Sequence, residues 1–190
     1  MKILTTKIIF IAGLFSFLSS WGQLPQTKSV NGLLITVESN LLNVPPKDKY
    51  IKVADSLDKN LARNSNDTTS LFNRALIYYL YNQMLAEPYQ HTKGTLENLT
   101  RAKTQIENAI KMGMQDFRAK QLRAQIYSEL CFRFTNDESW MFSKVQMTSR
   151  KKLFDNYKAM ANRYIDELAM LDKNNAYQYT KRKISYTYKL

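Results

Sequence analysis

Cysteine and histidine are almost absent from the chain, which has one of each in 190 residues. Cys131 has no second cysteine to pair with, so an intrachain disulfide framework and a cysteine-rich zinc site are both excluded. Cys131 lies in the apolar stretch Ile126–Phe132 and is predicted to be buried rather than nucleophilic. His91 has no second histidine to help it form a metal centre, and we interpret it as a solvated loop residue. The sequence therefore predicts no bound metal.

Turn-forming residues are also scarce. Five glycines and four prolines are too few for the turns of a sandwich or barrel built from many short strands. Neither a glycine-rich phosphate loop nor a Gly-x-Ser-x-Gly nucleophile elbow occurs. Carboxylates such as Asp55, Asp58, Glu97 and Glu107 are scattered at surface-like positions instead of being paired as glycosidase chemistry requires. These absences predict a non-enzymatic protein with no catalytic residues and no cofactor.

Acidic residues are outnumbered by basic ones, 16 to 28, which gives the chain a formal net charge of +12. Hydrophobic residues make up 44% of the sequence, a share that argues against global disorder. A chain of 190 residues is long enough to form one domain with a packed core.

The first residues have the order of a secretory signal peptide. Lys2 and Lys7 precede the apolar stretch Ile8–Leu18, and small residues, Ser20 and Gly22, stand before a predicted cut after Gly22. The apolar stretch is much shorter than the about 20 residues that cross a bilayer. We therefore predict a cleaved signal peptide over residues 1–22 and a periplasmic or secreted protein without a transmembrane span. A signal that ends just before a glutamine resembles those of exported Bacteroidetes proteins.

The remaining chain is predicted to be helical throughout. Apolar residues recur at spacings of three and four between residues 53 and 171, as amphipathic helices require. Pro45-Pro46 divides a segment over residues 23–47, predicted to be one helix, from a helical domain over residues 48–190. Strand-like alternation occurs at Leu33–Val37, which we nevertheless predict to be helical, and in the tail Ile184–Leu190, whose structure stays open.

Three related segments indicate an internal repeat. Arg74–Tyr78 matches Arg123–Tyr127, 49 residues later, and a weaker copy, Arg182–Tyr186, lies 59 residues further on. An apolar residue stands 21 positions before each arginine, namely Val53, Ala102 and Ala161. A spacing shared by three copies predicts stacked helical pairs with a common core.

This pattern resembles the tetratricopeptide repeat, a 34-residue pair of antiparallel helices. Ala102–Met114 fits the second helix of that family, and Ala75–Tyr78 and Ala124–Tyr127 fit the first. Leu171–Ala176 is similar to the turn between repeats. The spacings of 49 and 59 exceed 34, and the family's tryptophan and glycine are missing. The resemblance thus implies an all-α fold, a short superhelix of stacked antiparallel hairpins with lengthened helices or insertions.

The resemblance also implies a concave face, formed by the first helix of each pair, that binds a protein or peptide partner. The residues placed there are Asn73, Leu76, Tyr79, Arg118, Gln121, Gln125, Glu129, Tyr177 and Lys181. The repeated arginine has two interpretations, packing of its stem across the next turn or ligand binding, and we favour packing.

Basic clusters suggest an alternative function as an adaptor for an anionic glycan or lipid surface. The residues concerned are Arg150, Lys151, Lys152, Lys181, Arg182 and Lys183. Tyrosines surround the second cluster, and cations with aromatic rings can bind polyanions. An exported protein would meet lipid head groups or glycans rather than nucleic acid, so no nucleic-acid partner is predicted. A solubilising face explains the same residues.

Overall fold

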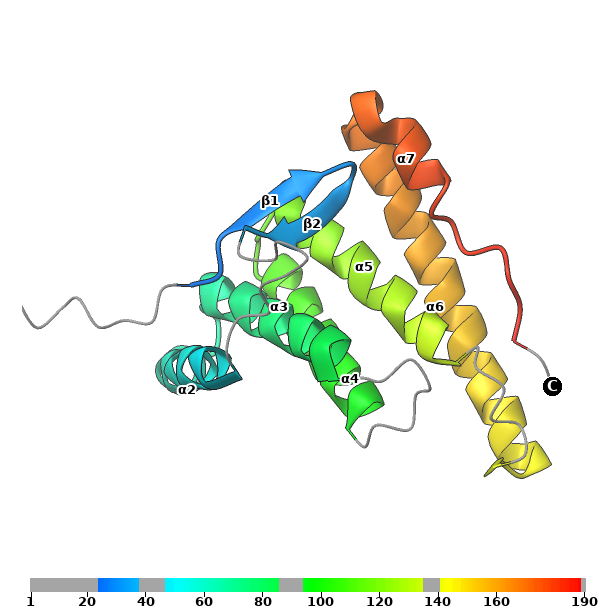
Figure 1. Ribbon diagram of the computed structural model, residues 1–190, viewed down its shortest axis with the longest axis horizontal. Helices are drawn as coiled ribbons and strands as arrows, with labels where there is room; N and C mark the ends of the chain where they lie inside the picture. Colours follow the sequence, from blue (N-terminus) through cyan, green and yellow to red (C-terminus); the bar gives the residue numbers. More distant parts are fainter. Residues whose placement is uncertain (1–23, 38–46, 86–93, 135–140, 189–190) are drawn as a thin grey trace, which may run out of the picture.

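Helices form most of the structure, a computed structural model that describes residues 24–37, 47–85, 94–134 and 141–188 (Figure 1). The prediction of a helical protein is confirmed. The helices are α2 (Lys47–Arg63), α3 (Thr68–Leu85), α4 (Thr95–Lys111), α5 (Phe117–Phe134), α6 (Lys144–Leu171), the 3₁₀ turn η2 (Lys173–Asn175) and α7 (Ala176–Thr180). The predicted signal peptide, residues 1–22, and His91 lie outside the described residues.

The helices pack against one another in chain order, from α2 on α3 to α6 on α7. The main core joins α3, α4, α5, α6 and the C-terminal segment, while Tyr50, Val53 and Leu57 of α2 form a smaller cluster with Ile77 of α3. Neighbour-to-neighbour packing of this kind buries the apolar stripe that a single helical pair would leave exposed.

Two aspartates at matched positions start two of the helices. Asp67 accepts hydrogen bonds from the backbone N–H of Thr69 and Ser70 at 3.1 and 3.4 Å, and so caps α3. Asp116, 49 residues later, accepts from the backbone N–H of Arg118 at 2.8 Å at the start of α5. The Arg118 side chain also donates to this carboxylate and lowers the pKa of Asp116.

The apolar positions with the shared 21-residue spacing are buried in all three pairs. Val53, Ala102 and Ala161 are buried, as are the residues four positions later, Leu57, Ile106 and Ile165. The first two arginine segments lie in α3 and α5. The third, Arg182–Tyr186, follows the end of α7 and is not helical, so the match between the three copies ends there.

The prediction of one helix over residues 23–47 is wrong. Thr27–Val30 (β1) and Leu33–Thr36 (β2) form an antiparallel hairpin in which Ser29 pairs with Leu34. Asn31 and Gly32 join the strands with φ values of 49° and 77°, the positive values that a type I′ turn needs. The Asn-Gly pair and the alternation Leu33–Val37 are the signals that outweigh a helical interpretation.

The C-terminal segment, left open between helix and strand, is neither. Residues 184–188 are extended and run back along α6 (Figure 1). Asn162 holds Ile184 at two points: its Oδ1 accepts from the backbone N–H at 2.8 Å, and its Nδ2 donates to the carbonyl at 3.1 Å. Lys158 donates to the carbonyl of Tyr186 at 2.6 Å. Side chains of α6 thus supply the bonds that a neighbouring strand would otherwise make.

Candidate functional site

The hairpin of β1 and β2 lies on α5, across the face predicted to bind a partner (Figure 1). Gln125 holds the backbone of Leu34 at two points: its Oε1 accepts from the N–H at 2.9 Å, and its Nε2 donates to the carbonyl at 3.1 Å. Gln121 donates through Nε2 to the Ser29 hydroxyl at 2.7 Å. Two residues predicted to hold a partner's peptide therefore hold an extended segment of the same chain.

The turn of the hairpin fits closely against the C-terminal end of the fold. A Cβ added at Gly32 would lie 2.8 Å from the ring of Tyr179 and 3.1 Å from Nη1 of Arg182. Tyr179 is buried, and its hydroxyl donates to Asp172 at 3.1 Å. Burial and the hydrogen bond to Asp172 raise the pKa of Tyr179. Glycine is therefore required at this contact for both space and backbone conformation.

The nine predicted groove residues divide into four groups. Asn73 and Arg118 line a recess of about 580 Å³ beside the start of the hairpin. The second group lines a recess of about 350 Å³ at the hairpin turn and consists of Tyr79, Gln121, Gln125 and Glu129. Leu76 is a core residue, whereas Tyr177 and Lys181 lie exposed on and beside α7, with the Lys181 ammonium 4.7 Å from the Tyr177 ring centre.

Among the residues that line the recess at the hairpin turn, Gly32 and Tyr179 belong to neither predicted site, and Arg182 was predicted only as part of a basic cluster. Gly32, Tyr179 and Arg182 close one side of the recess. The Asn31-Gly32 pair could have indicated a hairpin, but nothing in the sequence shows that its turn meets a residue almost 150 positions away.

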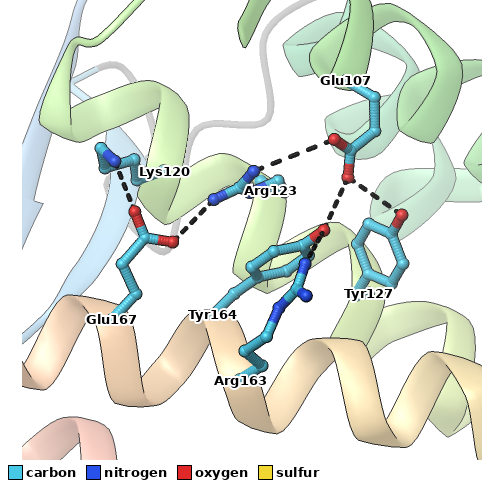
Figure 2. A network of polar contacts seen from close by, with 7 residues as sticks. All are labelled: Glu107, Lys120, Arg123, Tyr127, Arg163, Tyr164 and Glu167. Atoms are coloured by element: carbon cyan, nitrogen blue, oxygen red, sulfur yellow. Dashed lines mark hydrogen bonds and ion pairs between the residues drawn. The ribbon is translucent and has the colours of Figure 1, made fainter. Parts of the chain in front are cut away.

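A polar network joins α4, α5 and α6 (Figure 2). Arg123 lies between two carboxylates, 2.8 Å from Glu167 and 3.9 Å from Glu107, and its guanidinium stands 3.8 Å from the ring centre of Tyr164. The hydroxyls of Tyr127 and Tyr164 donate to Oε1 of Glu107 at 2.9 and 3.1 Å. The network also includes Lys120, bound to Glu167, and Arg163, which donates to the Tyr164 hydroxyl at 3.4 Å.

The features of this network are those of a structural element that holds α4, α5 and α6 together. A tyrosine hydroxyl is a protonated donor at neutral pH, and burial and the charge of Glu107 raise the pKa values of Tyr127 and Tyr164 further above it. Arg74 makes a simpler version of the arrangement, with its guanidinium 4.1 Å from the Tyr78 ring centre and two bonds to Asp58. The contacts of both arginines agree with the packing interpretation.

The six basic residues of the alternative function do not form one surface. Lys151 pairs with Asp155 and Lys183 with Asp166, two acids that lie about 16 Å apart along α6. Arg150 packs against Phe142, with 4.1 Å between guanidinium and ring centre, and donates to the Tyr188 hydroxyl. The other three are Lys152 and Lys181, which are exposed, and Arg182, which lines the recess at the hairpin turn. Each cluster therefore includes a carboxylate that reduces its charge.

Cys131 is buried, as predicted, and burial raises its pKa to about 12. Across the described ranges, no three His, Cys, Asp or Glu side chains gather where they could hold a metal ion. In the same part of the chain, no helix combines the length and the apolar character needed to cross a membrane.

Comparisons with protein-family models, with curated proteins and with solved structures found no match.

Proposed function

We propose that this protein is a non-enzymatic module of the cell envelope or secreted space that binds an extended segment of a protein or peptide partner. The binding face is formed by α3, α5 and the hairpin. The observation that carries the proposal is the two-point contact between the Gln125 amide and the Leu34 backbone, because it shows α5 holding an extended chain.

The chemistry of this contact is independent of the side chain that is held. An amide side chain that accepts from a backbone N–H and donates to the carbonyl of the same residue recognises any extended residue. The chain uses the contact twice, at Leu34 through Gln125 and at Ile184 through Asn162.

The polar row on α5 supports a binding role. Arg118, Gln121, Gln125 and Glu129 follow one another at spacings of three and four and therefore share one helix face. Gln121 is fully buried, and its Oε1 has no hydrogen-bond partner among the described residues. A buried amide without a complete set of partners costs free energy, and a bound chain with a free N–H would supply the missing donor.

The hairpin leaves room at both of its ends, in the recesses of about 580 and 350 Å³. A partner segment that follows the groove would contact Asn73 and Arg118 at one end and Tyr79 and Glu129 at the other. The resemblance to stacked helical repeats supports this placement, because such arrays form extended concave binding surfaces.

Capture of a partner from an envelope extract tests the proposal. The full chain is immobilised beside the double variant Asn73→Ala/Arg118→Gln and a control, Lys152→Gln, which changes an exposed residue of α6. Wild type and control are expected to retain the same proteins at low and moderate salt, and the double variant is expected to lose them. Equal retention by all three would contradict the proposal. Retention on heparin or anionic vesicles that moderate salt abolishes would favour the anionic-surface function instead.

A further inference from the structure

Arg182 is a half-buried cation that pairs with no carboxylate among the residues that the structure describes. Among the described residues, no hydrogen bond or ion pair satisfies its side chain, and its Nη1 atom is buried. Burial lowers the pKa of Arg182, and the Tyr179 hydroxyl, rather than an acid, acts in the opposite direction. By contrast, Arg74, Arg123 and Arg133 each contact a carboxylate within 3 Å.

The repeat explains why Arg182 lacks an acid within the described part of the chain. Asp58 binds Arg74, and Glu107 faces Arg123, each acid standing 16 residues before its arginine. Asp166 has the same position relative to Arg182, but both of its oxygens accept from Lys183, at 2.9 and 2.8 Å. The guanidinium of Arg182 lies instead beside Gly32, at the recess of about 350 Å³.

The walls of this recess are mostly apolar. They include Leu33 of the hairpin, Ala124 and Phe132 of α5, and Ile165 and Leu168 of α6. Glu129 also lines the recess, but it is paired with Arg133 at 2.7 Å and so does not neutralise Arg182.

Gln121, which lines the same recess from α5, contains a second unsatisfied group. Gln121 is fully buried, and its amide nitrogen already donates to Ser29 and, at 3.3 Å, to the Tyr179 hydroxyl. Its Oε1 accepts no hydrogen bond from the described residues. The recess thus combines an unpaired cation, an unpaired acceptor and apolar walls.

We propose that the recess binds the C-terminal residue of a peptide that has an apolar last side chain. Arg182 pairs with the terminal carboxylate, for which a guanidinium provides two parallel donors. Gln121 Oε1 accepts from the last backbone N–H, and the apolar walls enclose the side chain. A fatty acid has the carboxylate but no N–H for Gln121, and a volume of about 350 Å³ suits one large side chain.

This inference rests on the proposed function and names the part of the partner that enters the groove. Its test uses the full chain, titrated by NMR or calorimetry with acetyl-Ala-Ala-Leu as the free acid, with the same peptide as the C-terminal amide, and with decanoate. Wild type is expected to bind the free acid about tenfold more tightly than the amide or decanoate.

The matched variants are Arg182→Gln and Lys173→Gln, which remove a charge at the recess and an exposed charge in η2 away from it. Lys173→Gln is expected to keep the preference for the free acid, and Arg182→Gln to lose it. Arg182→Lys is expected to keep part of the preference for the free acid. This variant replaces Arg182→Gln in the test if Arg182→Gln does not fold. No binding of the acid at about 5 mM, equal binding of acid and amide, or a preference that survives both Arg182 variants would overturn the inference. Equal or tighter binding of decanoate would overturn it as well.

If the peptide titration overturned this inference, the capture of a partner through Asn73 and Arg118 would be unaffected. The two proposals can therefore be tested separately.

Discussion

Arg74 binds Asp58 through two hydrogen bonds, from Nε to Oδ1 at 2.7 Å and from Nη2 to Oδ2 at 3.0 Å. The two residues stand 16 positions apart and join α3 to α2. Arg123 and Glu107 have the same separation in the next pair, where the acid is 33% exposed instead of 53% and the arginine also contacts Glu167. The arginine at this position of the repeat therefore pairs with an acid in both units, but in two different environments.

The two environments predict different costs for the same substitution. Arg123→Met leaves Glu107 and Glu167, whose side chains are 33% and 30% exposed, without the cation between them, and is expected to lower the free energy of unfolding by about 2 kcal/mol. Arg74→Met leaves Asp58, whose side chain is 53% exposed, and is expected to cost about 1 kcal/mol. Urea denaturation followed by circular dichroism measures both. Equal losses of unfolding free energy would show that burial does not determine how strongly these ion pairs stabilise the fold.

Gln125→Ala is expected to release the hairpin without loss of helix. The Leu34 N–H and carbonyl lose their partners, which should cost about 1–2 kcal/mol of local stability. Hydrogen exchange at Leu34 is expected to accelerate while circular dichroism stays unchanged. Asn162→Ala is the matched control, since it should release Ile184 alone. Unchanged exchange at Leu34 would show that the amide does not hold the strand.

Gly32→Ala and Gly113→Ala separate a steric contact from backbone strain. Both glycines have positive φ, 77° and 99°, so each substitution is expected to cost about 1 kcal/mol for the backbone. Only at Gly32 would the new methyl group meet Tyr179, at 2.8 Å, whereas nothing lies within 4 Å at Gly113. We expect thermal unfolding to show the larger loss for Gly32→Ala. Similar losses would mean that the turn does not rest on Tyr179.

Stability is expected to fall as pH rises above about 10. The pKa values of Tyr127 and Tyr164 are raised by burial and by Glu107, so the folded state keeps protons that the unfolded state releases. The stabilisation is complete below the unfolded pKa near 10 and is lost as pH rises towards the folded values. Urea midpoints measured between neutral pH and pH 11 should show a shallower decline for Tyr127→Phe/Tyr164→Phe. An identical decline would exclude these two hydroxyls as its source.

Cys131 is expected to resist thiol reagents in the native state. Its side chain is buried, and a pKa raised to about 12 leaves almost no thiolate at neutral pH. Labelling with a chromogenic disulfide reagent should be slow in buffer and immediate in concentrated urea. Fast native labelling would show that α5 opens readily at this position.

The helices could be predicted because their information is local. The three-and-four spacing of buried positions such as Val53, Ala102 and Ile106 requires only neighbouring residues to be seen. The hairpin was missed although Asn31-Gly32 is a local signal, because the general helical pattern was extended over residues 23–47. The contact between the hairpin and Gln125 could not be predicted from the sequence, because 91 residues separate Leu34 from that amide.

Part of the candidate site could also be predicted, because helical spacing is local information. The face shared by Arg118, Gln121, Gln125 and Glu129 follows from helical spacing, and three of these four residues line the recess at the hairpin turn. Arg182 was assigned to a basic cluster because its charge is visible in the sequence, whereas its lack of an acid depends on which cation Asp166 binds.

The position of the hairpin also has a consequence for the order of folding. Residues 27–36 are synthesised early, but the groups that fix them, Gln121, Gln125 and Tyr179, follow about 90 to 150 positions later. Contacts between such distant residues close large loops and form slowly. The helices can therefore assemble neighbour by neighbour from α2 onwards, and the hairpin is fixed only after α5 and α7 are in place.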